Sequence, residues 1–246
     1  GLFSIALSIA LLPTFSDLVA QDDIPAMKKT LIFSLKLVFL VTMPAMAGLF
    51  ALSRPIVQVL FQRGVFNAQS TSMTSTCLLF FSLGLPFISV VKILAPAFYS
   101  LKDTKTPVIV GFFVMISYIL FSLILMKPLR VGGIALAMSL SSFLNFALLF
   151  FLLERKIGRV ERGKVFVSAV KSTLSAVLMG GLVWFFISRF EFNRLAFLYQ
   201  LGVLLSAIIL GIAVYFILSL LLNHEDLKNL REVFSRRRVF EEGEKR

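Results

Sequence analysis

Seven uninterrupted apolar stretches determine the solvent in which this chain folds. Each is long enough for a helix to cross a hydrocarbon layer of about 30 Å, which takes roughly 20 residues. They cover residues 1–19, 31–53, 74–100, 107–127, 132–153, 166–188 and 197–222. Of all residues, 58% are hydrophobic and only 15% are charged, against about a quarter charged in a soluble domain. We therefore predict an all-α integral membrane protein, a polytopic bundle of about seven transmembrane helices.

The basic residues indicate the orientation of these helices. The net charge is +12, but most Lys and Arg residues lie in short connections between the apolar stretches, so we do not expect a nucleic-acid partner. Sixteen of them fall in 20–30, 101–107, 154–165 and the segment after 222, and six fall in the alternate connections. Because the basic side of a membrane protein faces the cytoplasm, the first set and the C-terminus are predicted to be cytoplasmic.

Several classes of chemical site are excluded by composition. One cysteine, Cys77, and one histidine, His224, leave no disulfide framework and no Cys/His metal cluster within this chain. No nucleophile has a base at a suitable spacing, so we expect neither an enzyme nor a cofactor or metal site, although coupling to an unspecified ion stays open. Because the chain starts at Gly1 directly in an apolar stretch, without a basic leader, we expect a fragment of a longer protein.

Lys92 is the charge that most requires an explanation. It lies about eight residues, or roughly 12 Å of helix, inside the stretch 74–100. A lysine near the centre of a membrane helix costs about 2.5–3.5 kcal/mol. At about 100° per residue, Ser82, Ser89 and Tyr99 share an arc of about 100° with it. These four residues predict a substrate-binding cavity in which Lys92 presents a cation; deep snorkelling or a buried ion pair are the alternatives.

The same stretch contains residues that weaken a helix. Gly84, Pro86 and Pro96 each disturb the backbone hydrogen bonding, and interrupted helices at membrane depth usually face protein or a wet cavity. We therefore expect an interrupted helix around Lys92.

A second polar stripe occupies the stretch 132–153. Ser139, Ser142 and Asn145 recur at three-residue spacing. Small polar residues in this pattern either line a cavity or join neighbouring helices, and the sequence leaves both interpretations open.

Two further segments lie outside the hydrocarbon layer. Residues 54–67, beginning at Pro55, predict a short helix lying in the outer interface. Residues 223–246 predict a basic cytoplasmic tail with a short amphipathic helix, which fixes topology, binds anionic headgroups or contacts a regulatory partner.

Three stretches carry a resemblance to a known family. They are GLFSIALSIALLPTFS (1–16), RPIVQVLFQRGVF (54–66) and, most distinctively, VVKILAPAFYSLKDTKTPV (90–108). Through them the chain resembles the MurJ/MviN family of lipid II flippases, within the multidrug/oligosaccharidyl-lipid/polysaccharide exporter superfamily. The resemblance extends from residue 1 to about 222.

The resemblance implies a fragment of a two-lobed transporter with fourteen helices around a central cavity. Residues 1–153 would be the C-terminal lobe of the core, similar to helices 8–12 with the first one partial. Residues 154–222 would be two additional helices, similar to 13 and 14, which would supply a groove for a lipid tail. Residues 223–246 would be the basic tail. Lys92 matches by motif a family lysine thought to meet the diphosphate of the substrate.

The function implied is movement of an undecaprenyl-diphosphate-linked peptidoglycan precursor, lipid II, across the bacterial cytoplasmic membrane by alternating access. Its partners would be that precursor, membrane lipids and candidate cell-wall synthesis or division proteins. Another exporter of the superfamily, for drugs or polysaccharides, is the alternative, as is a non-transporting scaffold. Residues 107–126 contain no Asp or Glu, which speaks against sodium coupling through that helix.

Overall fold

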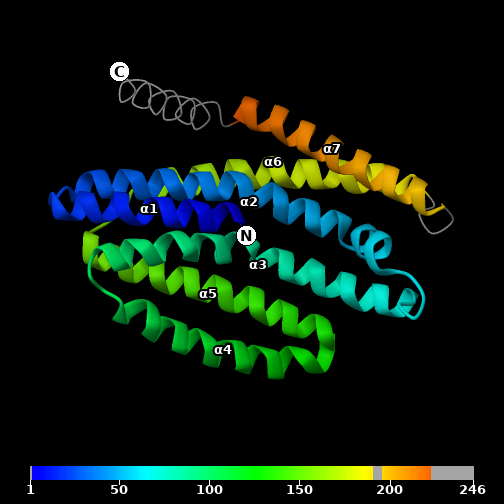
Figure 1. Ribbon diagram of the computed structural model, residues 1–246, viewed down its shortest axis with the longest axis horizontal. Helices are drawn as coiled ribbons and strands as arrows, with labels where there is room; N and C mark the ends of the chain where they lie inside the picture. Colours follow the sequence, from blue (N-terminus) through cyan, green and yellow to red (C-terminus); the bar gives the residue numbers. More distant parts are fainter. Residues whose placement is uncertain (1, 191–195, 223–246) are drawn as a thin grey trace, which may run out of the picture.

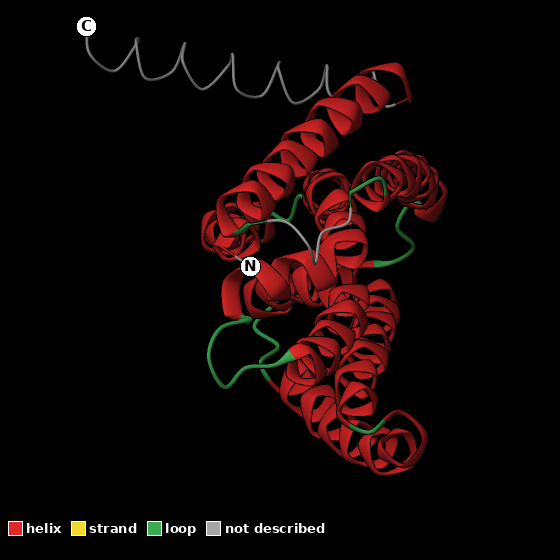
Figure 2. Cartoon of the chain, turned by 90° about the vertical axis from the view of Figure 1, so that its right-hand side faces the viewer, coloured by secondary structure: helices red, strands yellow, loops and turns green. Residues whose placement is uncertain are grey.

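The computed structural model describes residues 2–190 and 196–222, and every regular element in this part is an α-helix (Figure 2). The helices are α1 (Leu2–Ala20), α2 (Ile24–Phe61), α3 (Ala68–Ser100), α4 (Lys105–Leu129), α5 (Val131–Ile157), α6 (Arg162–Ser188) and α7 (Phe197–Leu222). All seven are long and apolar enough to cross a membrane. The predicted polytopic helical membrane fold is confirmed. The predicted tail, 223–246, lies outside the described residues.

The helices are arranged around α3, which packs between α2 and α5 (Figure 1). Helix α1 lies along α3, and α4 lies along α5. Helix α6 packs against α2, and α7 packs mainly against α6, so these two helices join the bundle through α2. Most of the largest buried side chains, among them Phe15, Leu31 and Phe98, come from α1, α2 and α3. The division into a core lobe, 1–153, and two additional helices, 154–222, stays a prediction.

Helix α2 is a single helix of 38 residues, so the predicted separate interfacial helix in 54–67 is wrong. Pro55 lies inside α2 and removes only one backbone hydrogen bond, because it lacks an N–H. In the turn that follows, Val57 and Val59 are both buried, and Val59 belongs to the hydrophobic core of the bundle. Tertiary packing therefore outweighs the local preference of proline for a helix start.

Helix α3 is also continuous, so the predicted interruption around Lys92 is wrong. It runs from Ala68 to Ser100 through Pro86 and Pro96. Both prolines are buried where α3 packs among its neighbours. A proline inside a membrane helix is tolerated when packing and local adjustment compensate for the missing N–H group.

Helices α3 and α5 approach each other very closely at Gly84. A Cβ atom placed on Gly84 would lie 2.8 Å from Oγ of Ser139 and 2.9 Å from its Cα. Without a side chain at residue 84, Ser139 Oγ reaches across and donates a hydrogen bond of 2.6 Å to the carbonyl of Phe80. A small residue on one helix and a short polar one on the other are typical of tightly packed membrane helices.

A hydrogen bond fastens α7 to α2. Pro44 has no N–H, so the carbonyl of Leu40, four residues earlier, lacks its usual helical donor. Tyr215 in α7 supplies the donor instead, with its hydroxyl 2.6 Å from the Leu40 oxygen. An unpaired carbonyl in hydrocarbon costs several kcal/mol by transfer estimates, so this hydrogen bond fixes how α7 sits on α2.

Candidate functional site

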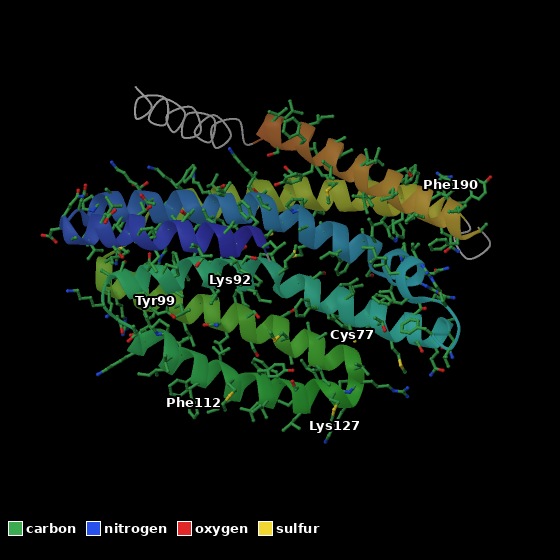
Figure 3. All side chains as sticks on the ribbon, viewed as in Figure 1. Cys77, Lys92, Tyr99, Phe112, Lys127 and Phe190 are labelled. Atoms are coloured by element: carbon green, nitrogen blue, oxygen red, sulfur yellow. The ribbon has the colours of Figure 1, made fainter. Side chains whose placement is uncertain are left out.

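Lys92 lies on α3, roughly 12 Å before the end of that helix, and is half-buried (Figure 3). Tyr99 lies closer to the end of the helix and is 44% exposed. Among the described residues, nothing forms an ion pair or hydrogen bond with the Lys92 ammonium. These two side chains lie on one face of α3, which we call the Lys92 flank. A charge on this flank is exposed either to solvent or to a ligand or helix that packs there.

The two serines predicted to share the site are placed differently. Ser82 and Ser89 are both buried, at 0% and 2% exposure. The hydroxyl of Ser82 donates to the carbonyl of Leu79, 2.7 Å away within its own helix. The structure therefore leaves Lys92 partly exposed and Tyr99 exposed on one face of α3, and it buries both serines.

The polar stripe on α5 faces neighbouring helices rather than an open surface. Ser139 is buried and bonded to the backbone of α3, as described above. Ser142 is buried and donates 2.7 Å to the carbonyl of Met138 in its own helix. Asn145 is half-buried, and its Oδ1 atom has no hydrogen-bond partner among the described residues. Ser139 thus acts in helix packing, while Asn145 retains a free polar atom.

Ion pairs tie the loops at one end of the bundle together, and the sequence pattern did not single them out. Asp103, in the connection between α3 and α4, lies 2.5 Å from Nζ of Lys156 at the end of α5. Its other oxygen accepts a 3.0 Å bond from the backbone N–H of Thr106. Burial alone would raise the pKa of Asp103, but the hydrogen bonds from Lys156 and Thr106 outweigh burial and hold that pKa well below its ordinary value.

The direction of this pKa shift fixes its effect on stability. A carboxyl group with a lowered pKa in the folded state stabilises the fold above its unfolded pKa of about 4, and this contribution is lost as the pH falls further. The Asp103–Lys156 ion pair therefore stays intact at neutral pH.

A second ion pair joins α5 to the start of α6. The two carboxylate oxygens of buried Glu154 accept hydrogen bonds of 2.9 and 2.8 Å from Nε of Arg162.

An apolar groove of about 450 Å³ lies between α2, α6 and α7. Its walls include Gly48 and Leu52 from α2, Met179 from α6, and Ile208 and Tyr215 from α7. The stretches 166–188 and 197–222 are predominantly apolar, so the sequence could place these helices but not the groove. Its position depends on how α7 is fastened to α2. In the described part of the chain, no three His, Cys, Asp or Glu side chains are placed to hold a metal ion.

Comparisons with known proteins agree on one family. Residues 1–221 match the family model described as lipid II flippase MurJ. The chain is 31% identical over 241 residues to a probable lipid II flippase MurJ of Rhizobium tropici, covering 97% of this chain. It is 36% identical over 185 residues to the corresponding protein of Vibrio cholerae, covering 75% of this chain.

A solved structure supports the same relationship. The fold matches a lipid II flippase MurJ in an inward closed conformation with a TM-score of 0.71 and 28% identity, over 90% of this chain. That match covers 43% of the solved chain, and the Rhizobium match covers 45% of its relative. The chain therefore spans a little under half the length of the proteins it resembles.

Proposed function

Because this chain belongs to the lipid II flippase MurJ family, we propose that it forms part of a flippase for lipid-linked peptidoglycan precursor. The observation that carries the proposal is the family match over residues 1–221. The substrate is an undecaprenyl-diphosphate-linked precursor, moved across the bacterial cytoplasmic membrane by alternating access. No bond is made or broken, so the protein is a transporter and not an enzyme. It needs no cofactor, and an ion gradient is a candidate driving force.

The proposed interaction with the substrate is electrostatic. Lys92 is half-buried on an open flank of α3 and has no anionic partner among the described residues. A cation held at this depth is stabilised when a diphosphate meets it. Tyr99, on the same flank, would contact the polar head of the precursor. Ser82, Ser89 and Asn145 would enter the site only after α3 and its neighbours shift during transport.

The apolar groove between α2, α6 and α7 is the proposed place for the lipid tail. Most of its lining side chains are aliphatic or small, with Tyr215 and Phe216 beside them, and such an apolar lining suits an isoprenoid chain. Gly211 allows α7 to approach α6 closely: a Cβ there would lie 3.1 Å from Cγ2 of Val183. Holding the tail on the outside of the bundle would leave the polar head free to reach the flank of Lys92.

Growth rescue tests the proposed function. The full-length protein is expected to restore growth in bacteria depleted of their own flippase, because only precursor delivered to the outer leaflet supports wall synthesis. The empty plasmid serves as the control, with protein abundance in the membrane measured in parallel. Failure to rescue despite normal abundance, together with export of a drug or polysaccharide, would favour the alternative exporter.

The proposed orientation places the C-terminus in the cytoplasm, from the distribution of sixteen against six basic residues. In a Cys77→Ser background, Val65→Cys is expected to react with an impermeant maleimide on intact cells, because Val65 is 98% exposed between α2 and α3. Glu161→Cys, an exposed position between α5 and α6, is expected to react only after permeabilisation. The opposite labelling pattern would invert the topology.

A further inference from the structure

A polar pocket of about 420 Å³ opens where α2 ends and α7 begins, at the same end of the bundle in Figure 1. It is lined by Gln58, Val59, Gln62, Arg63, Phe197 and Gln200. Gln58 is buried, with 8% of its surface exposed. Three amide groups and a guanidinium line one pocket, which belongs neither to the Lys92 flank nor to the apolar groove.

Arg63 supplies the positive charge of this pocket. Its guanidinium carbon lies 4.6 Å from the centroid of the Phe197 ring, and Nη2 donates 3.2 Å to the carbonyl of Val59. These interactions hold the guanidinium in place and leave most of its five N–H donors available. No carboxylate in the described part of the chain forms an ion pair with Arg63. The site is therefore built for an anion that the described residues do not supply.

Gln62 is also oriented for binding. Its Oε1 accepts a 3.1 Å hydrogen bond from the hydroxyl of Thr71, so its NH₂ group is the donor that this pocket-lining side chain can offer a ligand. Donors beside a fixed guanidinium suit a phosphate oxygen, which accepts charge-assisted hydrogen bonds.

The side chains around the pocket place it at the depth of lipid headgroups. On α2, Leu60 and Phe61 are 56% and 55% exposed, directly before the polar pair Gln62 and Arg63. On α7, Leu198 and Tyr199 are 76% and 71% exposed. Exposed aliphatic and aromatic residues next to polar ones are typical of the boundary between hydrocarbon and water.

An apolar path leads away from the pocket along the same two helices. Ile56, which lines the apolar groove, lies about one turn before Val59, which lines the pocket, so these two residues share one face of α2. On α7, Ala207 lines the groove and Gln200 lines the pocket, about two turns apart. A polar pocket followed by an apolar groove along one helix pair has the shape of an amphiphile.

We propose that this pocket binds an anionic phospholipid of the surrounding leaflet. The phosphodiester lies on the Arg63 guanidinium, hydroxyls of the headgroup contact the amides of Gln58, Gln62 and Gln200, and an acyl chain follows α2 and α7 toward the groove. One arginine matches the single negative charge of a phosphodiester. The site is separate from the flippase function and does not rest on it, because binding is measured without transport.

Binding of phosphatidylglycerol to the purified full-length protein tests the proposal by native mass spectrometry in detergent. Phosphatidylcholine with the same chains and soluble glycerol phosphate are the comparison ligands. Wild-type protein is expected to retain phosphatidylglycerol preferentially. Arg63→Gln is expected to weaken that binding roughly tenfold, the loss typical of removing a hydrogen bond to a charged group.

Two further variants keep the test decisive. Gln62→Glu keeps an oxygen to accept the bond from Thr71 but adds a negative charge, so it is expected to weaken binding to a similar degree even if Arg63→Gln fails to fold. Arg189→Gln is the matched control, because Arg189 also stacks on a ring, 4.5 Å from the centroid of Phe185, without lining the pocket. It is expected to leave binding unchanged.

The contrary outcomes are distinct. Equal binding of phosphatidylcholine and phosphatidylglycerol would overturn the assignment of an anionic ligand. Equal losses of phosphatidylglycerol binding in Arg63→Gln and Arg189→Gln would attribute the effect to general surface charge. They would overturn the proposed binding site in the pocket. Glycerol phosphate binding as tightly as the lipid would make the ligand a soluble phosphate and overturn its membrane origin.

Discussion

Lys92→Ala is expected to abolish growth rescue by the full-length protein in flippase-depleted cells. The ammonium lies at a depth where an unpaired lysine costs about 2.5–3.5 kcal/mol, so removing it should ease insertion and leave the fold intact. What the variant loses is the cation that would meet the diphosphate. Removing one partner of a desolvated charge pair costs about 2–5 kcal/mol, which is a loss of at least tenfold in binding.

Two matched lysine variants separate the mechanism from general charge effects. Lys92→Arg keeps the cation and is expected to retain part of the rescue. Lys127→Ala removes an exposed lysine near the end of α4, far from Lys92 in Figure 3, and is expected to rescue fully. Full rescue by Lys92→Ala at normal abundance would remove Lys92 from the mechanism and leave the proposed function resting on the family match alone.

The sequence was sufficient for the number of helices and their approximate positions, because hydrocarbon demands long apolar segments. It failed at Pro55, Pro86 and Pro96, where local rules predict a helix start or an interruption. There the lost hydrogen bond is local, whereas the compensating packing comes from other helices: α3, with its two buried prolines, packs between α2 and α5. Such packing has no signature in a stretch of ten or twenty residues.

The candidate site shows the same division. The charge of Lys92 and its depth could be predicted, since both follow from its position within one apolar stretch. Which of its neighbours are exposed could not be predicted, because the angular position of a residue on a helix does not show which other helices cover it. Ser89 is only about 60° from Lys92 on the helix, yet it is buried and Tyr99 is exposed. The Arg63 pocket could not be predicted from the sequence for a related reason. It forms only where the start of α7 meets the end of α2.

Gly84→Ala is expected to lower the thermal stability of the purified full-length protein markedly, because it acts where α3 and α5 are packed backbone against side chain. The added Cβ would meet Oγ of Ser139 at 2.8 Å and its Cα at 2.9 Å. A hydroxyl can rotate away, but a backbone atom cannot, so the two helices must separate. That separation also weakens the 2.6 Å bond from Ser139 to the carbonyl of Phe80. Overpacking of this kind costs about 1–3 kcal/mol.

Gly111→Ala is the control for this variant, since a Cβ at Gly111 meets nothing within 4 Å. Alanine is the better helix former by about 1 kcal/mol, so this change should preserve or raise the unfolding temperature. Adding Ser139→Gly to Gly84→Ala removes the clash with the hydroxyl but leaves the clash with the backbone of residue 139, and should restore stability only in part. If Gly84→Ala unfolds at the wild-type temperature, α3 and α5 do not meet closely at this point, and their tight packing does not hold the bundle together.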